Sequence, residues 1–259
     1  QVTNQGDAWT ATVDQLARLL ESGGDDEASA VDAIAAMAER MQVLARRVAE
    51  LHAALARRTG DPAFDPVPAT AADVERWTVA VQAECEQTMQ RLGQHHEGWS
   101  AALKEHAGRV LASAPVLRQR IADAATGGAP PHLKTRLHGD LHLGQVLICR
   151  DDFLLIDFEG EPRRSFEERR AKHSALRDVA GLLRSFDYAR HTAVQQAAKN
   201  AADIERLAPL ARRWGQDVRV AFLHAYGATA VRHGVYAGDR EFAAVQPLLG
   251  LFELEKALY

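Results

Sequence analysis

The chain has 259 residues, of which 47% are hydrophobic and 25% charged, and this composition excludes a mainly disordered protein. Its 31 basic and 35 acidic residues give a formal charge of −4, which argues against a nucleic-acid-binding protein, because such proteins carry a basic surface. No apolar run reaches the roughly 20 residues of a membrane span and no signal peptide opens the sequence, so we expect a cytoplasmic protein. Cys85 and Cys149 are expected to be core thiols, and the first residue, Gln1, suggests a piece of a longer polypeptide.

The sequence from Asp14 to about Ala125 has the pattern of successive helices. The clearest helix spans Asp26–Arg58, where apolar residues recur at alternating steps of three and four: Ile34, Met37, Met41, Leu44, Val48, Leu51 and Leu55. Because this heptad seam is short, it favours an antiparallel helical hairpin within one domain over an intermolecular coiled coil. Two further helices are predicted at Ala71–Leu92 and Gly98–Ala125.

The pattern changes at the helix-breaking sequence Thr-Gly-Gly-Ala-Pro-Pro, residues 126–131. Strand-like runs follow at Leu133–Leu137, Gln145–Cys149 and Phe153–Asp157, and the last two predict a β-hairpin. Helices are then expected near Ser174–Arg190, Val194–Ala208, Ala211–Tyr236 and Asp239–Leu258. The predicted fold class is therefore α+β and predominantly α-helical. Its subregions are a helical part (1–130), a part with polar loops and the hairpin (131–165), and a second helical part (166–259).

Three oxygen-bearing side chains surround the predicted hairpin. Asp140 lies on a glycine-flanked loop, Gln145 leads into the first strand, and Asp157 ends the second. Because strands rise about 3.3 Å per residue, the hairpin can bring Gln145 and Asp157 to the same end. Carboxylate and amide oxygens without sulfur suit a hard cation such as Mg²⁺ that is shared with phosphates.

The segment from His138-Gly139-Asp140 through Gln145 to Asp157 resembles the catalytic and metal loops of protein-kinase-like phosphotransferases, in the aminoglycoside and choline kinase branch. The closer resemblance is to maltokinases, including those fused to trehalose synthase. It rests on the glutamine at 145, on the Asp-Phe-Glu-Gly-Glu-Pro block at 157–162 and on the Ser-Ala-Leu-Arg-Asp-Val-Ala-Gly-Leu-Leu-Arg-Ser-Phe-Asp-Tyr segment at 174–188. The likeness extends over the whole chain and implies ATP- and Mg²⁺-dependent transfer of phosphate to maltose, giving maltose 1-phosphate for glycogen synthesis.

The resemblance also implies roles for single residues. Asp140 would orient the sugar hydroxyl and accept its proton, while Gln145 and Asp157, assisted by Glu159, would hold the metal. Support of the catalytic loop would come from His138 and Asp178, and sugar contacts from His142, Arg184, Tyr188 and Tyr226.

Each assignment has a structural alternative. Asp140 may cap a turn, Gln145 may be an ordinary hairpin residue, and Glu159 may pair with Arg163 or Arg164. Asp178 may form a structural ion pair with Arg177. His138 and His142 have the spacing of zinc ligands on a helix, but Gly139 interrupts any helix there.

A nucleotide-clamping lobe has no counterpart in this sequence. Such a lobe needs a strand lysine, and upstream of Asp140 the sequence has only Lys104 and Lys134. We therefore expect the carboxy-terminal lobe of a kinase, with the ATP-binding lobe and a trehalose synthase domain as possible missing partners, and little activity of its own. Two alternatives remain: a kinase for another sugar or amino sugar, such as glucosamine, and a non-catalytic module that docks through the helix at Asp26–Arg58.

Overall fold

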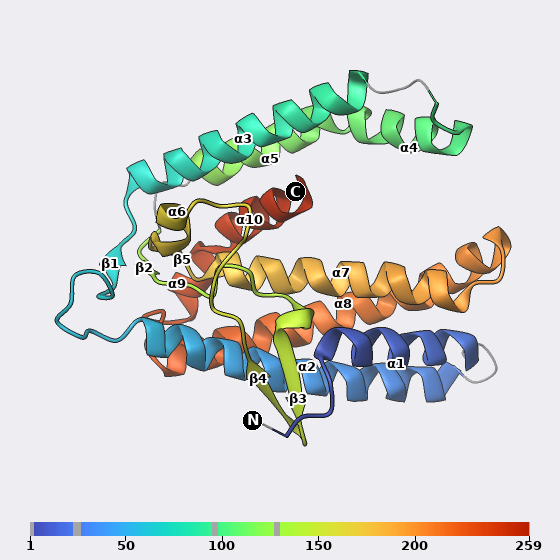
Figure 1. Cartoon of the computed structure of the whole chain (residues 1–259), viewed down its shortest axis with the longest axis horizontal. Helices are drawn as coiled ribbons and strands as arrows, with labels where there is room; N and C mark the ends of the chain where they lie inside the picture. Colours follow the sequence, from blue (N-terminus) through green and yellow to red (C-terminus); the bar gives the residue numbers. More distant parts are fainter. Residues whose placement is uncertain (1–2, 23–26, 95–97, 127–129, 259) are drawn as a thin grey trace.

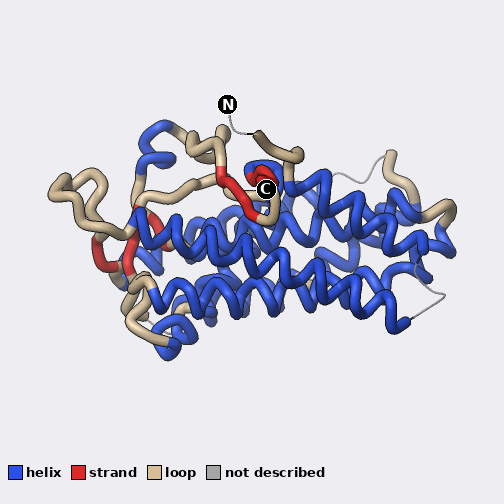
Figure 2. Tube along the Cα trace, turned by 90° about the horizontal axis from the view of Figure 1, so that it is seen from below, coloured by secondary structure: helices blue, strands red, loops and turns tan. Residues whose placement is uncertain are grey.

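The structure is a computed structural model that describes residues 3–22, 27–94, 98–126 and 130–258. Its helices form two layers joined by one helix (Figure 1, Figure 2). The larger layer contains α1 (Ala8–Ser22), α2 (Glu27–Leu55), α7 (Leu176–Ala197) and α8 (Ala201–Arg232). The smaller layer contains α3 (Ala71–Gln94), α4 (Ala101–Ala112) and α5 (Ala114–Thr126). Helix α10 (Gln246–Leu258) packs against α7 on one side and against α3 and α5 on the other, so it ties the two layers together.

The core of the larger layer lies between α2 and α8. The seam predicted on α2 is buried as far as Val48, and Leu51 and Leu55 are half-buried at its end. It packs against α8, whose Trp214, Phe222 and Tyr226 are fully buried. The seam is therefore intramolecular, as predicted, but its partner is a helix distant in the sequence. The simple helical hairpin is corrected, because α2 packs mainly against α8 and the aromatic side chains of α8 fill the space beside the seam.

The predicted hairpin is present as β3 (Val146–Cys149) and β4 (Asp152–Leu155), paired antiparallel with Val146 opposite Leu155. The amino-terminal segment extends this sheet, since the Gln5 amide donates to the Ile148 carbonyl at 2.8 Å. A second small sheet has the order β1 (Val67–Pro68), β2 (Leu133–Thr135), β5 (His173–Ser174). The two sheets lie on either side of residues 136–142, which carry the glycine-flanked aspartate.

Several element boundaries differ from the predictions. The helix predicted over Gly98–Ala125 is two helices, because the chain breaks at Ser113, whose hydroxyl donates to the Val110 carbonyl. The two helices predicted on either side of Pro209 are one, and α8 runs through that proline. This helix begins at Ala201, after the N-cap residue Asn200, whose side chain accepts the Asp203 amide at 3.0 Å. The breaker sequence lies partly outside the described residues, at 127–129.

Three short elements complete the fold. They are a 3₁₀ turn, η1 (Leu143–Gln145), which precedes β3, and the helices α6 (Phe166–Arg170) and α9 (Asp239–Ala244). The helix predicted over Asp239–Leu258 is thus divided into α9 and α10. In the part of the chain that the structure describes, no helix combines the length and the apolar character that a membrane span requires.

Candidate active site

The loop that carries Asp140 follows β2 and is closely packed. Gly139 has φ +87, and a Cβ atom there would lie 3.1 Å from the Cα atom of Gly160. Both the backbone conformation and the space therefore require glycine. Asp140 itself is half-buried at the surface of the loop. The next turn is held by Ser185 of α7, whose hydroxyl accepts the Leu143 amide at 3.0 Å.

Asp178 holds the loop from below. Its two carboxylate oxygens accept the backbone amides of His138 and Gly139, each at 2.9 Å, so both residues before Asp140 are fixed to α7. Burial alone would raise the pKa of Asp178, but the hydrogen bonds from His52 and from the Gly139 amide hold that pKa below its ordinary value. The carboxylate therefore stays ionised and acts as an acceptor. Arg177 pairs instead with Glu255, at 2.9 Å.

His138 connects the Asp140 loop with the end of the hairpin. Its Nε2 atom lies 2.7 Å from the Ile156 carbonyl, which makes Nε2 the protonated nitrogen, and its Nδ1 accepts the Asp140 amide at 3.4 Å. The His138 ring also packs against Phe158, with 4.8 Å between the ring centroids. Nδ1 of His142 is likewise engaged, because it accepts the Gly144 amide at 3.1 Å. The histidine pair thus serves loop structure, and the described residues contain no cluster of metal-ligating groups of the zinc type.

Gln145 and Asp157 meet at the open end of the hairpin. The Gln145 Nε2 donates to the Asp157 Oδ2 at 2.7 Å, so the amide oxygen of one and the remaining carboxylate oxygen of the other are left for a ligand. Asp157 has φ +65, a left-handed conformation that is uncommon outside glycine and often marks a functional position. One carboxylate and one amide fit Mg²⁺, which uses few protein ligands and completes its shell with phosphates and water.

Glu159 lies apart from this pair. Its backbone carbonyl accepts Arg169 at 3.1 Å, and it lines a different cavity, between Phe64, Phe158 and α6. The metal role of Glu159 therefore stays a prediction.

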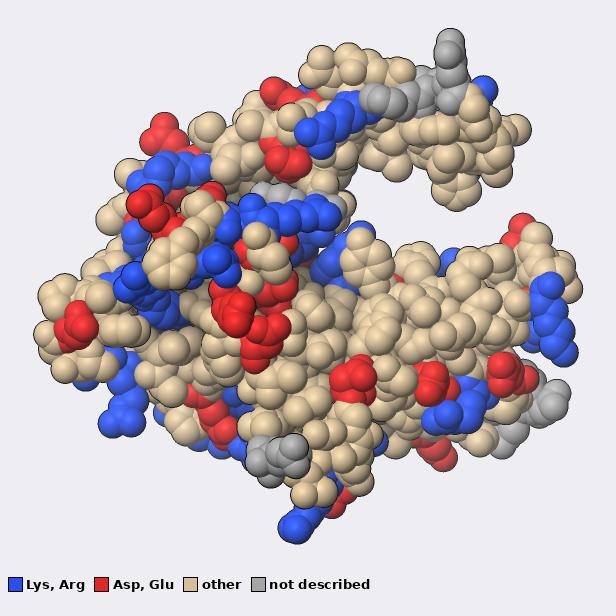
Figure 3. Space-filling model, in the orientation of Figure 1, with Lys and Arg blue, Asp and Glu red and all other residues tan. Residues whose placement is uncertain are grey.

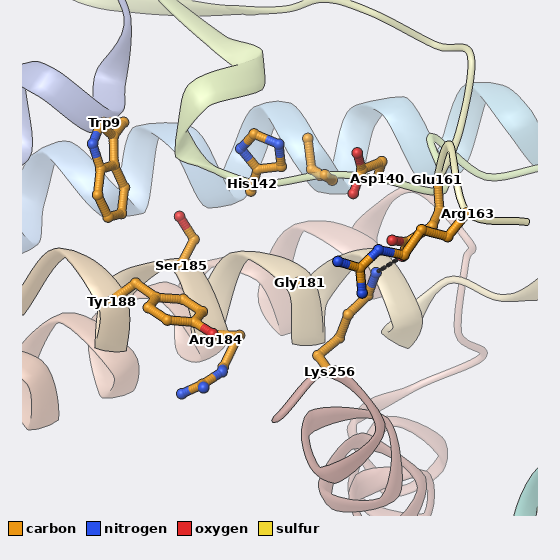
Figure 4. A pocket seen from close by; sticks show the side chains of 11 residues that line it. Trp9, Asp140, His142, Glu161, Arg163, Gly181, Arg184, Ser185, Tyr188 and Lys256 are labelled. Carbon is orange, nitrogen blue, oxygen red and sulfur yellow. Dashed lines mark hydrogen bonds and ion pairs between the residues drawn. The ribbon is translucent and has the colours of Figure 1, made fainter. Parts of the chain in front are cut away.

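A cavity of about 410 Å³ opens beside Asp140 (Figure 4). Three of the predicted sugar contacts, His142, Arg184 and Tyr188, line it, and the Arg184 guanidinium stacks on the Tyr188 ring at 4.1 Å. The sequence reasoning missed several other lining residues: Trp9, Glu161, Arg163, Ser185 and Lys256. For Glu161 and Arg163 a signal existed, since both follow Asp157 in the same polar block.

Opposite charges meet in this cavity. Lys256 of α10 pairs with Glu161 at 2.9 Å, and both side chains are largely buried. Figure 3 shows a group of acidic side chains near the middle of this face, with basic side chains next to it. The cavity can therefore bind a polar ligand that both donates and accepts hydrogen bonds.

Tyr226, the fourth predicted sugar contact, lies elsewhere. Its side chain is completely buried between α2 and α8, and its hydroxyl is 2.9 Å from the Nδ1 atom of His52. Tyr226 therefore does not line the cavity.

The site combines two features that phosphoryl transfer requires. The Asp140 carboxylate lies beside a cavity large enough for an acceptor, and Gln145 and Asp157 form a carboxylate–amide pair suited to Mg²⁺.

Two curated proteins that this chain resembles are glucosamine kinases. The glucosamine kinase of Streptacidiphilus jiangxiensis is 31% identical over 232 residues, which are 87% of this chain and 44% of that protein. The enzyme of Mycolicibacterium smegmatis is 32% identical over 207 residues, 78% of this chain and 45% of that protein. This chain therefore spans less than half the length of the curated relatives that it matches. No known family model matches it.

Solved structures give the same result. A crystal form of glucosamine kinase superposes with a TM-score of 0.71 at 26% identity, covering 98% of this chain and 53% of that one. A glucosamine kinase in complex with glucosamine, ADP and inorganic phosphate superposes with a TM-score of 0.70.

The predicted maltokinase relationship is wrong, because these similar proteins are glucosamine kinases. The interpretation as the carboxy-terminal lobe of a maltokinase behind a trehalose synthase is corrected with it. The error has a physical cause. The resemblance rested largely on the segments around Asp140 and Asp157, and motifs for phosphoryl transfer carry little information about the sugar acceptor.

Proposed function

We propose that this protein takes part in ATP- and Mg²⁺-dependent phosphorylation of an amino sugar, with glucosamine as the preferred acceptor. The observation that carries the proposal is the position of Asp140, which lines the polar cavity and stands on a loop bonded to the same hairpin end that presents Gln145 and Asp157. The names of the similar proteins, and the glucosamine and ADP bound in one of their structures, support both the donor and the acceptor.

In this mechanism the chain mainly positions the reactants. Asp140 orients the acceptor hydroxyl and takes its proton as the hydroxyl oxygen bonds to the γ-phosphorus of ATP, while the bond from that phosphorus to the bridging oxygen breaks and ADP leaves. Gln145 and Asp157 would hold Mg²⁺, and the bound ion would supply positive charge to neutralise the nucleotide phosphates. Asp178 and His138 keep the loop in place through the hydrogen bonds described above.

The cavity suits an amino sugar. Sugar hydroxyls can bond to Ser185 and His142, and a ring face can pack on Trp9 or Tyr188. Glu161, like Asp140, has a carboxylate that can accept hydrogen bonds from an ammonium group. Lys256 already contacts one oxygen of that carboxylate. The positive charge of the amino group therefore has carboxylate partners in a cavity that also contains the basic side chains of Arg163, Arg184 and Lys256.

The test is ADP release in the encoded protein, measured with glucosamine and with a panel of neutral sugars. Asp140→Asn should lower kcat by about 10²–10⁴-fold while the far-UV spectrum stays unchanged. Asp187→Asn, an exposed acid of α7 outside the cavity, is the matched control and should keep the parent rate. A near-parent rate for Asp140→Asn would disprove the assignment of the base, and preference for a neutral sugar would disprove the acceptor.

A further inference from the structure

A chain of buried polar side chains begins at Asp178 beneath the Asp140 loop, and its members beyond Asp178 have no place in the mechanism above. His52 of α2 contacts Asp178 through Nε2, at 3.3 Å, and contacts the Tyr226 hydroxyl through Nδ1, at 2.9 Å. His52, Asp178 and Tyr226 are at most 2% exposed. Tyr236, also buried, interacts with Tyr226 at the far end. The described residues place this group at the junction of α2, α7 and α8.

The Asp178 carboxylate fixes the direction of its contact with His52. An ionised carboxylate can only accept hydrogen bonds, so the Nε2 atom of His52 that faces it, at 3.3 Å, carries a proton and donates. The other ring nitrogen, Nδ1, lies 2.9 Å from the Tyr226 hydroxyl. Tyr226 therefore holds the far side of the ring in the orientation that points Nε2 at Asp178.

Asp178 passes this constraint to the loop. The oxygen contacted by His52 is Oδ2, the same oxygen that accepts the His138 amide, while Oδ1 accepts the Gly139 amide. Without a third donor, the carboxylate could rotate about its Cβ–Cγ bond and lose the alignment of both amides. Small displacements of a catalytic group cost large factors in rate, since phosphoryl transfer depends on the placement of the reactants.

Packing alone does not explain a histidine and a tyrosine here. His52 follows Val48 by one helical turn, so it continues the apolar seam of α2, where leucine or methionine would fill the space. A buried polar pair usually contributes less to stability than apolar side chains of similar volume. The polar pair is therefore best explained by the group that it contacts.

We propose that His52 and Tyr226 are positioning residues for phosphoryl transfer, acting through Asp178 on the loop of Asp140. This inference rests on the proposed function for its kinetic part, but its structural part is independent. Both residues should influence kcat and leave the KM for the sugar unchanged, because neither lines the acceptor cavity.

The test compares variants that keep or remove single hydrogen bonds. His52→Leu should lower kcat about 10²-fold, and Tyr226→Phe, which removes only the hydroxyl, about 3- to 10-fold. His52→Gln can place an N–H near the former Nε2 and should recover most of the loss, whereas the shorter His52→Asn should not. Thr78→Val on α3 removes a buried hydrogen bond far from the loop and is the control for general destabilisation.

Hydrogen exchange of residues 136–141, followed by mass spectrometry, gives a readout that needs no activity. Exchange there should accelerate in His52→Leu and stay at the parent rate in His52→Gln and Thr78→Val. Unchanged exchange in a folded His52→Leu protein would overturn the inference, and so would equal losses of kcat in His52→Leu and His52→Gln. If exchange behaves as expected but the parent phosphorylates no sugar, the proposed function fails and the positioning of the loop stands.

Discussion

Replacing Asp178 by asparagine changes little in shape and should still be costly. The new side chain has one acceptor oxygen where the carboxylate had two, and its NH₂ group must face a backbone amide that now bonds at 2.9 Å. The less harmful orientation turns the NH₂ toward Gly139, because the other orientation would also face the donor on His52. The Gly139 N–H is then left without an acceptor, and the remaining hydrogen bonds are made to a neutral oxygen and not to a charged one.

These losses add up to about 3 kcal/mol of unfolding free energy, taking an orphaned buried donor and weakened charge-assisted bonds together. For a chain of this size the expected fall in Tm is about 6–12 °C. Thermal unfolding followed by circular dichroism at pH 7 measures it, with Asp187→Asn on the same helix as the control. Equal Tm values for the parent and Asp178→Asn would refute the argument that this carboxylate braces the loop.

The same comparison has a defined pH dependence. Because the folded state lowers the pKa of Asp178 below 3.8, its ionised form contributes stability that is fully present above that value. This contribution is lost as the pH falls through the lower, folded value. The Tm difference between the parent and Asp178→Asn should therefore be constant from about pH 5 upward and should shrink in acid. A difference that grows in acid would contradict the sign of the shift.

Three further outcomes are expected. Gly181→Ala should reduce both Tm and kcat, because the added Cβ would collide with the Leu141 carbonyl and push the Asp140 loop off α7; an unchanged kcat would show that the contact is not rigid. Asp157→Asn should raise the Mg²⁺ concentration needed for half-maximal ADP release by tenfold or more, and an unchanged requirement would remove Asp157 from the metal site. Lys134→Met leaves the buried Asp73 without its 2.6 Å partner and should cost about 1–3 kcal/mol in urea denaturation, with kcat retained where the protein is folded.

The sequence was sufficient for most helices and for the hairpin, because these depend on local periodicity. It failed where tertiary contacts decide. Pro209 indicates a helix end from sequence, yet α8 continues through it, with Leu207 and Ala211 buried on either side. The cap at Asn200, followed three residues later by Asp203, was the better local signal and was overlooked.

The candidate site shows the same division. Asp140, Gln145 and Asp157 lie within 18 positions of one another, so loop and hairpin geometry was enough to expect the contact between Gln145 and Asp157. Trp9 and Lys256 reach the cavity from opposite ends of the chain, and no local sequence pattern predicts that they lie together there. The assignment of Tyr226 as a sugar contact rested on the resemblance alone. An aromatic residue on a helix can belong to a core or to a pocket, and only the packing of α2 on α8 decides between them.

The left-handed backbone at Asp157 affects how any mutational scan of this protein should be designed. Alanine at φ +65 carries a conformational cost of about 1 kcal/mol or more that has nothing to do with the lost carboxylate, whereas asparagine tolerates this region. An alanine scan would thus credit the metal site with an effect that belongs partly to the backbone. Glycine in place of Asp157 would remove the side chain without that penalty. The difference between the glycine and alanine variants then measures the backbone cost, and the difference between the asparagine variant and the parent measures the charge.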